Sequence, residues 1–138
     1  MKTVLEALRD TEKQYKTVLT KMTKSNGLTI AEWQLLSHVA AGFDTQDKLS
    51  DETGLDNSTL SRQLSSLLKK EMVSNIAVGR DRRQLIYELT VKGNDVLTAV
   101  NEQHMIYEET AFKLWSAEEK SMVQILLNRL EKSLSKQI

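Results

Sequence analysis

Proline is absent from this 138-residue chain, and its five glycines all lie between residues 27 and 93. Proline and glycine are the strongest helix breakers, so nothing interrupts a helix in residues 1–26 or 94–138. In the first of these segments, apolar side chains recur at helical spacing from Val4 to Met22, and Asn26 and Gly27 mark a helix end. The sequence therefore predicts long helices at both ends of the chain.

Three shorter helices are expected between these ends. Thr29 and Glu32 have the spacing of a capping box and predict a helix that ends at the second glycine. The next segment has room only for a helix of about two turns, roughly residues 45–53, which Thr45 opens. Asp56 then caps a longer helix. Its inward side is apolar and consists of Leu60, Leu64, Leu67 and Leu68. Two short helices, a tight turn and a polar outer face predict a helix-turn-helix.

The outer face of the last of these helices is polar and basic. A helix advances by about 100° per residue, so the side chains opposite the leucines share one face. That face carries Ser58, Arg62, Ser65, Ser66 and Lys69, with Thr59 at its edge.

After Met72 the hydrophobic period becomes that of a strand. Segments 73–78 and 85–89 flank a basic tip at residues 79–84, which predicts a β-hairpin. A long helix follows from Val91, and a last helix begins at the capping box of Ser116 and Glu119. A coiled-coil-like seam is expected along the long helix at Leu97, Val100, His104, Tyr107, Ala111 and Leu114. The predicted fold is mainly α with a small β-hairpin wing, a winged helix-turn-helix with helical ends.

Charge and composition exclude several classes of protein. The 19 basic and 19 acidic side chains balance, so the chain is not basic throughout. Cysteine is absent, which removes disulfides, thiolate nucleophiles and zinc ligation by cysteine. No run approaches the roughly 20 apolar residues of a membrane helix, and the N-terminus has acids within its first ten residues, unlike a signal peptide, so we expect a cytoplasmic protein without a membrane partner. HExxH, GxSxG and Gly-rich phosphate-loop motifs are missing, so we expect neither catalysis nor a cofactor.

The middle of the chain is nevertheless basic. Residues 56–92 hold seven Lys or Arg and four acids, a net charge of +3, whereas residues 27–55 hold one Lys and five acids, a net charge of −4. A polar helix fits the major groove of DNA, and a narrow basic tip reaches the minor groove. Ser58 and Thr59 are expected to donate to phosphate, and Arg62 to read guanine. The full predicted DNA-binding set is Ser58, Thr59, Ser61, Arg62, Ser65, Lys69, Arg80, Arg82 and Arg83.

Two other interpretations of these residues compete with DNA binding. Each of these side chains taken singly is typical of a solvated surface. Only their occurrence together, on a helix-turn-helix that a basic hairpin follows directly, favours a DNA-binding surface. A helical interaction module without DNA binding is the second competitor, and the adjacent arginines of the wing argue against it.

Four segments of the chain resemble the MarR family of winged-helix transcriptional regulators. They are LTIAEWQLLSHVA, LSDETGLDNSTLSRQLSSLLKKEMV, GRDRRQLIYELTVKG and LWSAEEKSMVQILLNRL. The most specific part is the run from Asp81-Arg82-Arg83 to Leu89-Thr90-Val91-Lys92-Gly93, directly after the Ser/Thr-Arg helix. The resemblance implies that Asp81 braces the wing and that Arg82 or Arg83 enters the minor groove. Glu71 stands where the family often has Gly, so either it tolerates a left-handed conformation or the helix ends differently.

The resemblance also implies a homodimer with one winged helix-turn-helix per subunit. Residues 29–92 would form the DNA-binding domain, and residues 1–28 and 93–138 the dimerisation region. The apolar stripes of the terminal helices exceed what one small winged core can cover, which independently favours a partner. A twofold dimer spaces its recognition helices about one DNA turn apart, so we expect a pseudo-palindromic operator.

A regulator of this kind implies a signal. We expect a repressor, or less often an activator, whose DNA affinity a small molecule changes, and the resemblance points to a phenolic or other lipophilic ligand. Candidates to line its crevice are Tyr15, Met22, Trp33 and Tyr107, although aromatic residues at helical spacing are more often core. His104 has carboxylates near it in sequence, but two histidines 66 residues apart form no ligand motif. We therefore expect an interface or core histidine and no metal.

Overall fold

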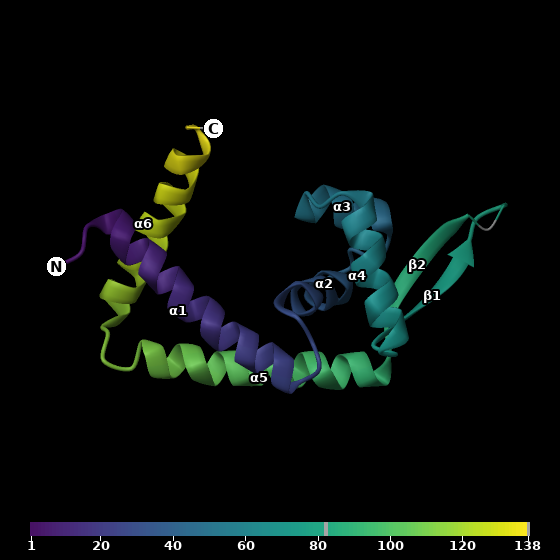
Figure 1. The fold of residues 1–138 in the computed structure, drawn as a ribbon, viewed down its shortest axis with the longest axis horizontal. Coiled ribbons are helices and arrows are strands. Elements are labelled where there is room, and N and C mark those ends of the chain that lie inside the picture. Colours follow the sequence, from purple (N-terminus) through teal and green to yellow (C-terminus); the bar gives the residue numbers. More distant parts are fainter. Residues whose placement is uncertain (82, 138) are drawn as a thin grey trace. The chain divides into compact units, whose positions relative to one another are not determined.

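The computed structural model describes residues 1–81 and 83–137. In that part of the chain there are six helices and one antiparallel hairpin, which confirms the predicted fold class (Figure 1). The chain divides into two compact units, Met1–His104 and Met105–Ile138. In chain order the elements are α1 (Val4–Ser25), α2 (Ile30–Ala40), α3 (Gln46–Thr53), α4 (Asn57–Lys69), β1 (Val73–Val78), β2 (Gln84–Leu89), α5 (Val91–Ala111) and α6 (Ala117–Ser135).

Side-chain caps determine where most of the helices begin. Thr29 and Ser116 open α2 and α6 in full capping boxes, as predicted, and Thr3 opens α1 in the same way. The Thr45 hydroxyl and the Asp56 carboxylate accept from backbone amides in the first turns of α3 and α4. Each cap satisfies amides that a helix start leaves unpaired, and such caps contribute roughly 0.5–2 kcal/mol each. The predicted starts of α2, α3, α4 and α6 are confirmed.

The core of the first unit lies where α2, α3, α4, the hairpin and the start of α5 meet. Leu36, Leu49, Leu60 and Leu67 are fully buried there, and fully burying a leucine contributes roughly 1.5–3 kcal/mol. The whole cluster of buried side chains is Leu28, Leu35, Leu36, Val39, Leu49, Leu60, Leu64, Leu67, Met72, Val73, Tyr87, Leu97 and Val100. This core fixes the three helices of the helix-turn-helix against one another.

The hairpin pairs Val73 with Leu89 at its base and Val78 with Gln84 next to its tip. Strand β2 therefore begins one residue earlier than the sequence predicts. The amide of Tyr87 donates to the carbonyl of Asp44 at 2.8 Å, and the Tyr87 side chain is buried. The hairpin is thus attached to the loop between α2 and α3.

The end of α4 follows the left-handed alternative. Glu71 has a φ of 59°, so it adopts the conformation that favours glycine. Its carbonyl accepts a 2.6 Å hydrogen bond from the Thr90 hydroxyl, and the Lys92 ammonium donates to the carbonyl of Lys70. A Cβ on Gly93 would overlap the carbonyl oxygen of Met72. The Thr90–Gly93 motif therefore packs the start of α5 directly on the chain that leaves α4.

The second unit comprises the last residues of α5, the turn after it, and α6. Helix α5 ends at Ala111, and Leu114 lies in that turn and is 95% exposed. The predicted seam is therefore wrong at Leu114, because the chain has already left the helix to reach the cap at Ser116. Along α6, Met122, Ile125, Leu126 and Leu127 are exposed. No helix in the described part of the chain is long and apolar enough to cross a membrane.

Candidate nucleic-acid interface

Helix α4 presents a row of polar side chains to solvent. Its inner side buries Leu60, Leu64 and Leu67. Its open side is polar and basic, with Ser58, Ser61, Arg62, Ser65 and Lys69 all exposed and Thr59 half-buried. These side chains repeat every three to four residues and so form one continuous strip along the helix. Serine hydroxyls and an arginine in such a strip can contact both base edges and phosphates.

The start of α4 is organised around Asp56. Its carboxylate accepts from the amide of Thr59 at 2.8 Å. Hydrogen bonds from the Thr59 side chain and amide lower the pKa of Asp56, so its negative charge is retained at this helix start. The cap leaves Ser58 and Arg62 exposed on the open side. The Thr59 and Ser58 hydroxyls at this helix start therefore both interact with Asp56.

One residue at this surface has no signal in the sequence. The Gln46 side-chain amide, at the start of α3, donates to the carbonyl of Asn57 at 3.1 Å and to the Ser61 hydroxyl at 3.0 Å. It ties the two helices of the helix-turn-helix together beside the exposed strip. A helical-wheel analysis of α4 alone could not find it, because the contact joins residues 15 positions apart.

Ser66 does not belong to the open side of α4, contrary to the helical-wheel prediction. It is half-buried, and its hydroxyl donates to Glu32 Oε2 at 2.8 Å. A helical wheel gives only an angle around one axis. Ser66 lies at the edge of the polar arc, where α2 approaches α4 and covers it.

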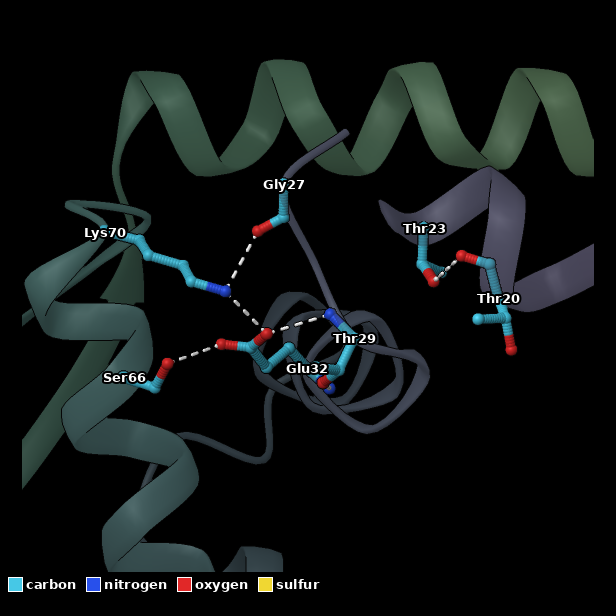
Figure 2. A network of polar contacts seen from close by, with 7 residues as sticks. All are labelled: Thr20, Thr23, Gly27, Thr29, Glu32, Ser66 and Lys70. Atoms are coloured by element: carbon cyan, nitrogen blue, oxygen red, sulfur yellow. Dashed lines mark hydrogen bonds and ion pairs between the residues drawn. The ribbon is translucent and has the colours of Figure 1, made fainter. Parts of the chain in front are cut away.

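Glu32 is the centre of a polar network between α2 and α4. Its side chain accepts from the amide of Thr29, from Ser66 and from the ammonium of Lys70, the last at 2.8 Å. Figure 2 shows that Lys70 also donates to the carbonyl of Gly27, at 2.9 Å. Burial by itself raises the pKa of Glu32. The hydrogen bonds from Lys70, the Thr29 amide and Ser66, together with the charge of Lys70, outweigh burial and lower this pKa from its ordinary value of 4.5.

The tip of the hairpin carries the predicted wing residues. Arg80, Asp81 and Arg83 are exposed, and Arg82 lies outside the described residues. Asp81 Oδ1 accepts from the amide of Arg83 at 3.4 Å, and the Arg83 guanidinium lies 3.3 Å from Asp81 Oδ2. An exposed pair of this kind contributes little to stability.

Two of the four predicted effector-pocket residues come together with His104. The Tyr15 hydroxyl and His104 Nε2 share a 2.7 Å hydrogen bond, and the Trp33 and His104 rings lie 5.4 Å apart between centroids. The Trp33 indole donates to Asn101. Met22 packs against the core of the first unit, and Tyr107 belongs to the second. This Tyr15–Trp33–His104 cluster joins α1, α2 and α5.

The cavity at the helix-turn-helix is separate from this cluster. A cavity of about 370 Å³ lies between α2, α3 and α4, away from this cluster, and includes His38, Glu52 and Gln63 in its lining. Among residues 1–81 and 83–137, no group of three or more His, Asp or Glu side chains is arranged to hold a metal ion.

Known proteins match both the sequence and the fold of this chain. Residues 26–84 match the model of the MarR family. The HTH-type transcriptional regulator YxaD of Bacillus subtilis is 34% identical over 62% of this chain and 60% of its own length. PecS of Dickeya dadantii, also an HTH-type transcriptional regulator, is 32% identical over 58% of this chain and 48% of its own length. The chain thus matches about half of each of these relatives.

The fold is also found in a solved structure. The crystal structure of the Staphylococcus aureus MepR–DNA complex superposes with a TM-score of 0.79 and covers 96% of both chains at 19% identity. These relatives are transcriptional regulators rather than enzymes, in line with the expectation from the sequence. The resemblance seen in the sequence is confirmed: residues 26–84 are similar to the MarR family, and the fold is that of a winged helix-turn-helix.

Proposed function

We propose that this chain is a homodimeric, sequence-specific DNA-binding regulator of transcription. The observation that carries the proposal is the exposed strip of serine, arginine and lysine side chains along α4. This helix would lie in the major groove as the recognition helix, where Arg62 can donate to guanine O6 and N7. Ser58 and Lys69, towards the two ends of the helix, would contact phosphates and fix its position.

The hairpin tip would extend this contact into the minor groove. Arg83 is exposed, and both its amide and its guanidinium contact Asp81, which supports a bracing role for the acid. A narrow minor groove has an enhanced negative potential that attracts arginine. We propose that Arg80, Arg83 and the adjacent Arg82 supply this contact.

A second copy of the chain is the partner proposed for the second unit. Ile125, Leu126 and Leu127 are 64%, 52% and 46% exposed, and Met105 and Ile106 of α5 are exposed in the same unit. Several large apolar side chains exposed in one small unit are costly in water and are typical of an interface. A twofold dimer would bring two copies of α4 to successive major-groove faces of a pseudo-palindromic site.

A small-molecule effector completes the proposal. The Tyr15–Trp33–His104 cluster combines aromatic faces with hydrogen-bonding groups, which suits a phenolic or other lipophilic aromatic ligand. Because the cluster joins α1 and α5 to α2, a ligand there would change how the DNA-binding domain is held. We propose repression that such a ligand relieves.

Selection of bound sequences from random DNA tests this function. We expect the protein to recover a pseudo-palindromic site whose half-sites lie about one helical turn apart. Sedimentation of the free protein should show a dimer. Recovery of no preferred sequence would contradict the proposed function, and a preferred site bound by a monomer would contradict its dimeric form.

A further inference from the structure

We propose that Glu32, Ser66 and Lys70 are positioning residues, which set the orientation in which α4 presents its exposed strip to the bases. The inference rests on the proposed DNA-binding function and concerns how that function obtains its sequence preference. None of the three side chains belongs to the exposed strip itself. They act at the edge of the polar arc, where α2 approaches α4.

The geometry gives α4 two directional attachments to a single buried group. Ser66 and Lys70 are four residues apart, so they lie one turn from each other on the same side of the chain. Both donate to the Glu32 carboxylate at 2.8 Å, and Glu32 is only 3% exposed. The carboxylate is itself held by the amide of Thr29, in the capping box that opens α2. The C-terminal half of α4 is thereby fastened to the start of α2.

Apolar packing alone fixes such an orientation less well. The leucines of α4 bury area, and the hydrophobic effect that drives this is not directional. Hydrogen bonds require both a short distance and near-linear geometry, so two of them on one carboxylate restrict rotation and sliding of the helix. Arg62 and Ser65 lie within about one turn of Ser66, and their reach to base edges depends on that rotation.

Lys70 also connects this network to the turn that follows α1. Its ammonium donates to the carbonyl of Gly27, as Figure 2 shows. The neighbouring Asn26 side chain donates to Gln103 of α5 at 3.2 Å. Lys70 is therefore bonded to the turn at residues 26–27, which follows α1 and is also bonded to α5.

A direct contact between Lys70 and DNA phosphate is the competing explanation. Lys69, beside it, is exposed on the open strip, whereas Lys70 is half-buried and already bonded to two oxygen acceptors. The two explanations differ in salt dependence. Loss of one phosphate contact lowers the slope of log affinity against log salt by about 0.9, whereas loss of a positioning residue leaves that slope unchanged.

The test compares the selected operator with a random-sequence duplex of equal length. Ser66→Ala/Lys70→Met removes both attachments from α4 without altering its exposed strip. We expect its preference for operator over random duplex to fall about tenfold, equivalent to losing one good base contact. Glu32→Gln keeps the shape and hydrogen-bonding capacity of the side chain and should retain most of the preference. Lys21→Met removes the same charge from an exposed position of α1 and is the matched control.

Two results would overturn the inference. One is an unchanged preference in the double variant, including an equal loss of affinity for both duplexes, and the other is a reduced salt slope. Ser66→Ala alone leaves the ion pair intact, so it keeps the test decisive if the double variant does not fold. It should lower the preference in the same direction while the variant still unfolds in a single cooperative transition, and an unchanged preference would equally contradict the inference. Wild-type protein without any sequence preference would instead contradict the proposed function itself.

Discussion

Replacing Glu32 by Gln should lower the free energy of unfolding by about 1–2 kcal/mol near pH 7. The substitution keeps the size of the side chain. Its amide oxygen can still accept from Thr29 and Lys70, and its NH₂ group can donate to Ser66, whose hydroxyl then accepts. The change therefore removes the negative charge while the geometry of the network is retained.

The magnitude follows from the surroundings of the carboxylate. Hydrogen bonds to a charged group contribute about 1.5–3 kcal/mol, against about 0.5–1.5 kcal/mol for neutral ones. The Glu32 side chain is 4% exposed, but that of Lys70 is 35% exposed, so water screens part of the ion pair. The uncharged amide is also easier to bury. These opposing effects leave a modest net loss rather than the several kcal/mol of a fully buried pair.

The same reasoning predicts the pH dependence. The pKa of Glu32 is lowered on folding from its ordinary value of 4.5. The charged carboxylate therefore contributes stability above the unfolded-state pKa, and this contribution is lost as the pH falls through the folded-state pKa. Glutamine does not titrate, so the advantage of wild type over Glu32→Gln should be constant near neutral pH and shrink below pH 4.5.

Urea denaturation at a fixed protein concentration measures this difference, because the stability of the proposed dimer would depend on concentration. Glu12→Gln, at an exposed position of α1, is the matched control and should have little effect. A Glu32→Gln variant as stable as wild type at pH 7, or a difference that grows as the pH falls, would refute the reasoning.

Three further substitutions follow from the fold and the wing. Gly93→Ala should destabilise the protein by about 1–3 kcal/mol in thermal melts, since its Cβ would overlap the Met72 carbonyl, whereas exposed Asn94→Ala should not. Glu71→Gly should stabilise it by about 1 kcal/mol, because the left-handed conformation costs a side chain that much, and an unchanged melt would argue against that conformation. Arg82→Ala with Arg83→Ala should weaken DNA binding more than about tenfold in mobility shifts, as expected for lost groove contacts, and leave the dimer intact in sedimentation. Unchanged affinity would exclude a DNA-binding wing.

Local signals in the sequence predicted most of the fold. A capping side chain accepts from amides within three residues of itself, so the local sequence predicts where a helix begins. The helix starts predicted in this way are those at Thr29, Thr45, Asp56 and Ser116. Burial of the leucines of α4 follows from the helical period in the same way. The end of α5 was missed because the 3-4 spacing continues to Leu114 although the helix stops at Ala111.

The sequence predicted the candidate DNA-binding surface only where the exposure of its residues follows from α4 alone. The exposed strip of α4 follows from its own period, but the roles of Ser66 and Gln46 depend on which neighbouring helix approaches. The partner of Lys70 lies 38 residues away in the sequence, and no spacing rule connects the two. Tertiary packing decides such contacts, and that packing is set by the whole core.

The most direct measurement of the central claim is the affinity of Arg62→Ala for the selected operator and for single-base variants of it. Arg62 is exposed in the middle of the strip on α4. The account predicts a loss of about 1–3 kcal/mol on the operator and a relaxed preference at one base pair in each half-site. Unchanged affinity and unchanged preference at every position would contradict the assignment of α4 as the helix that reads DNA.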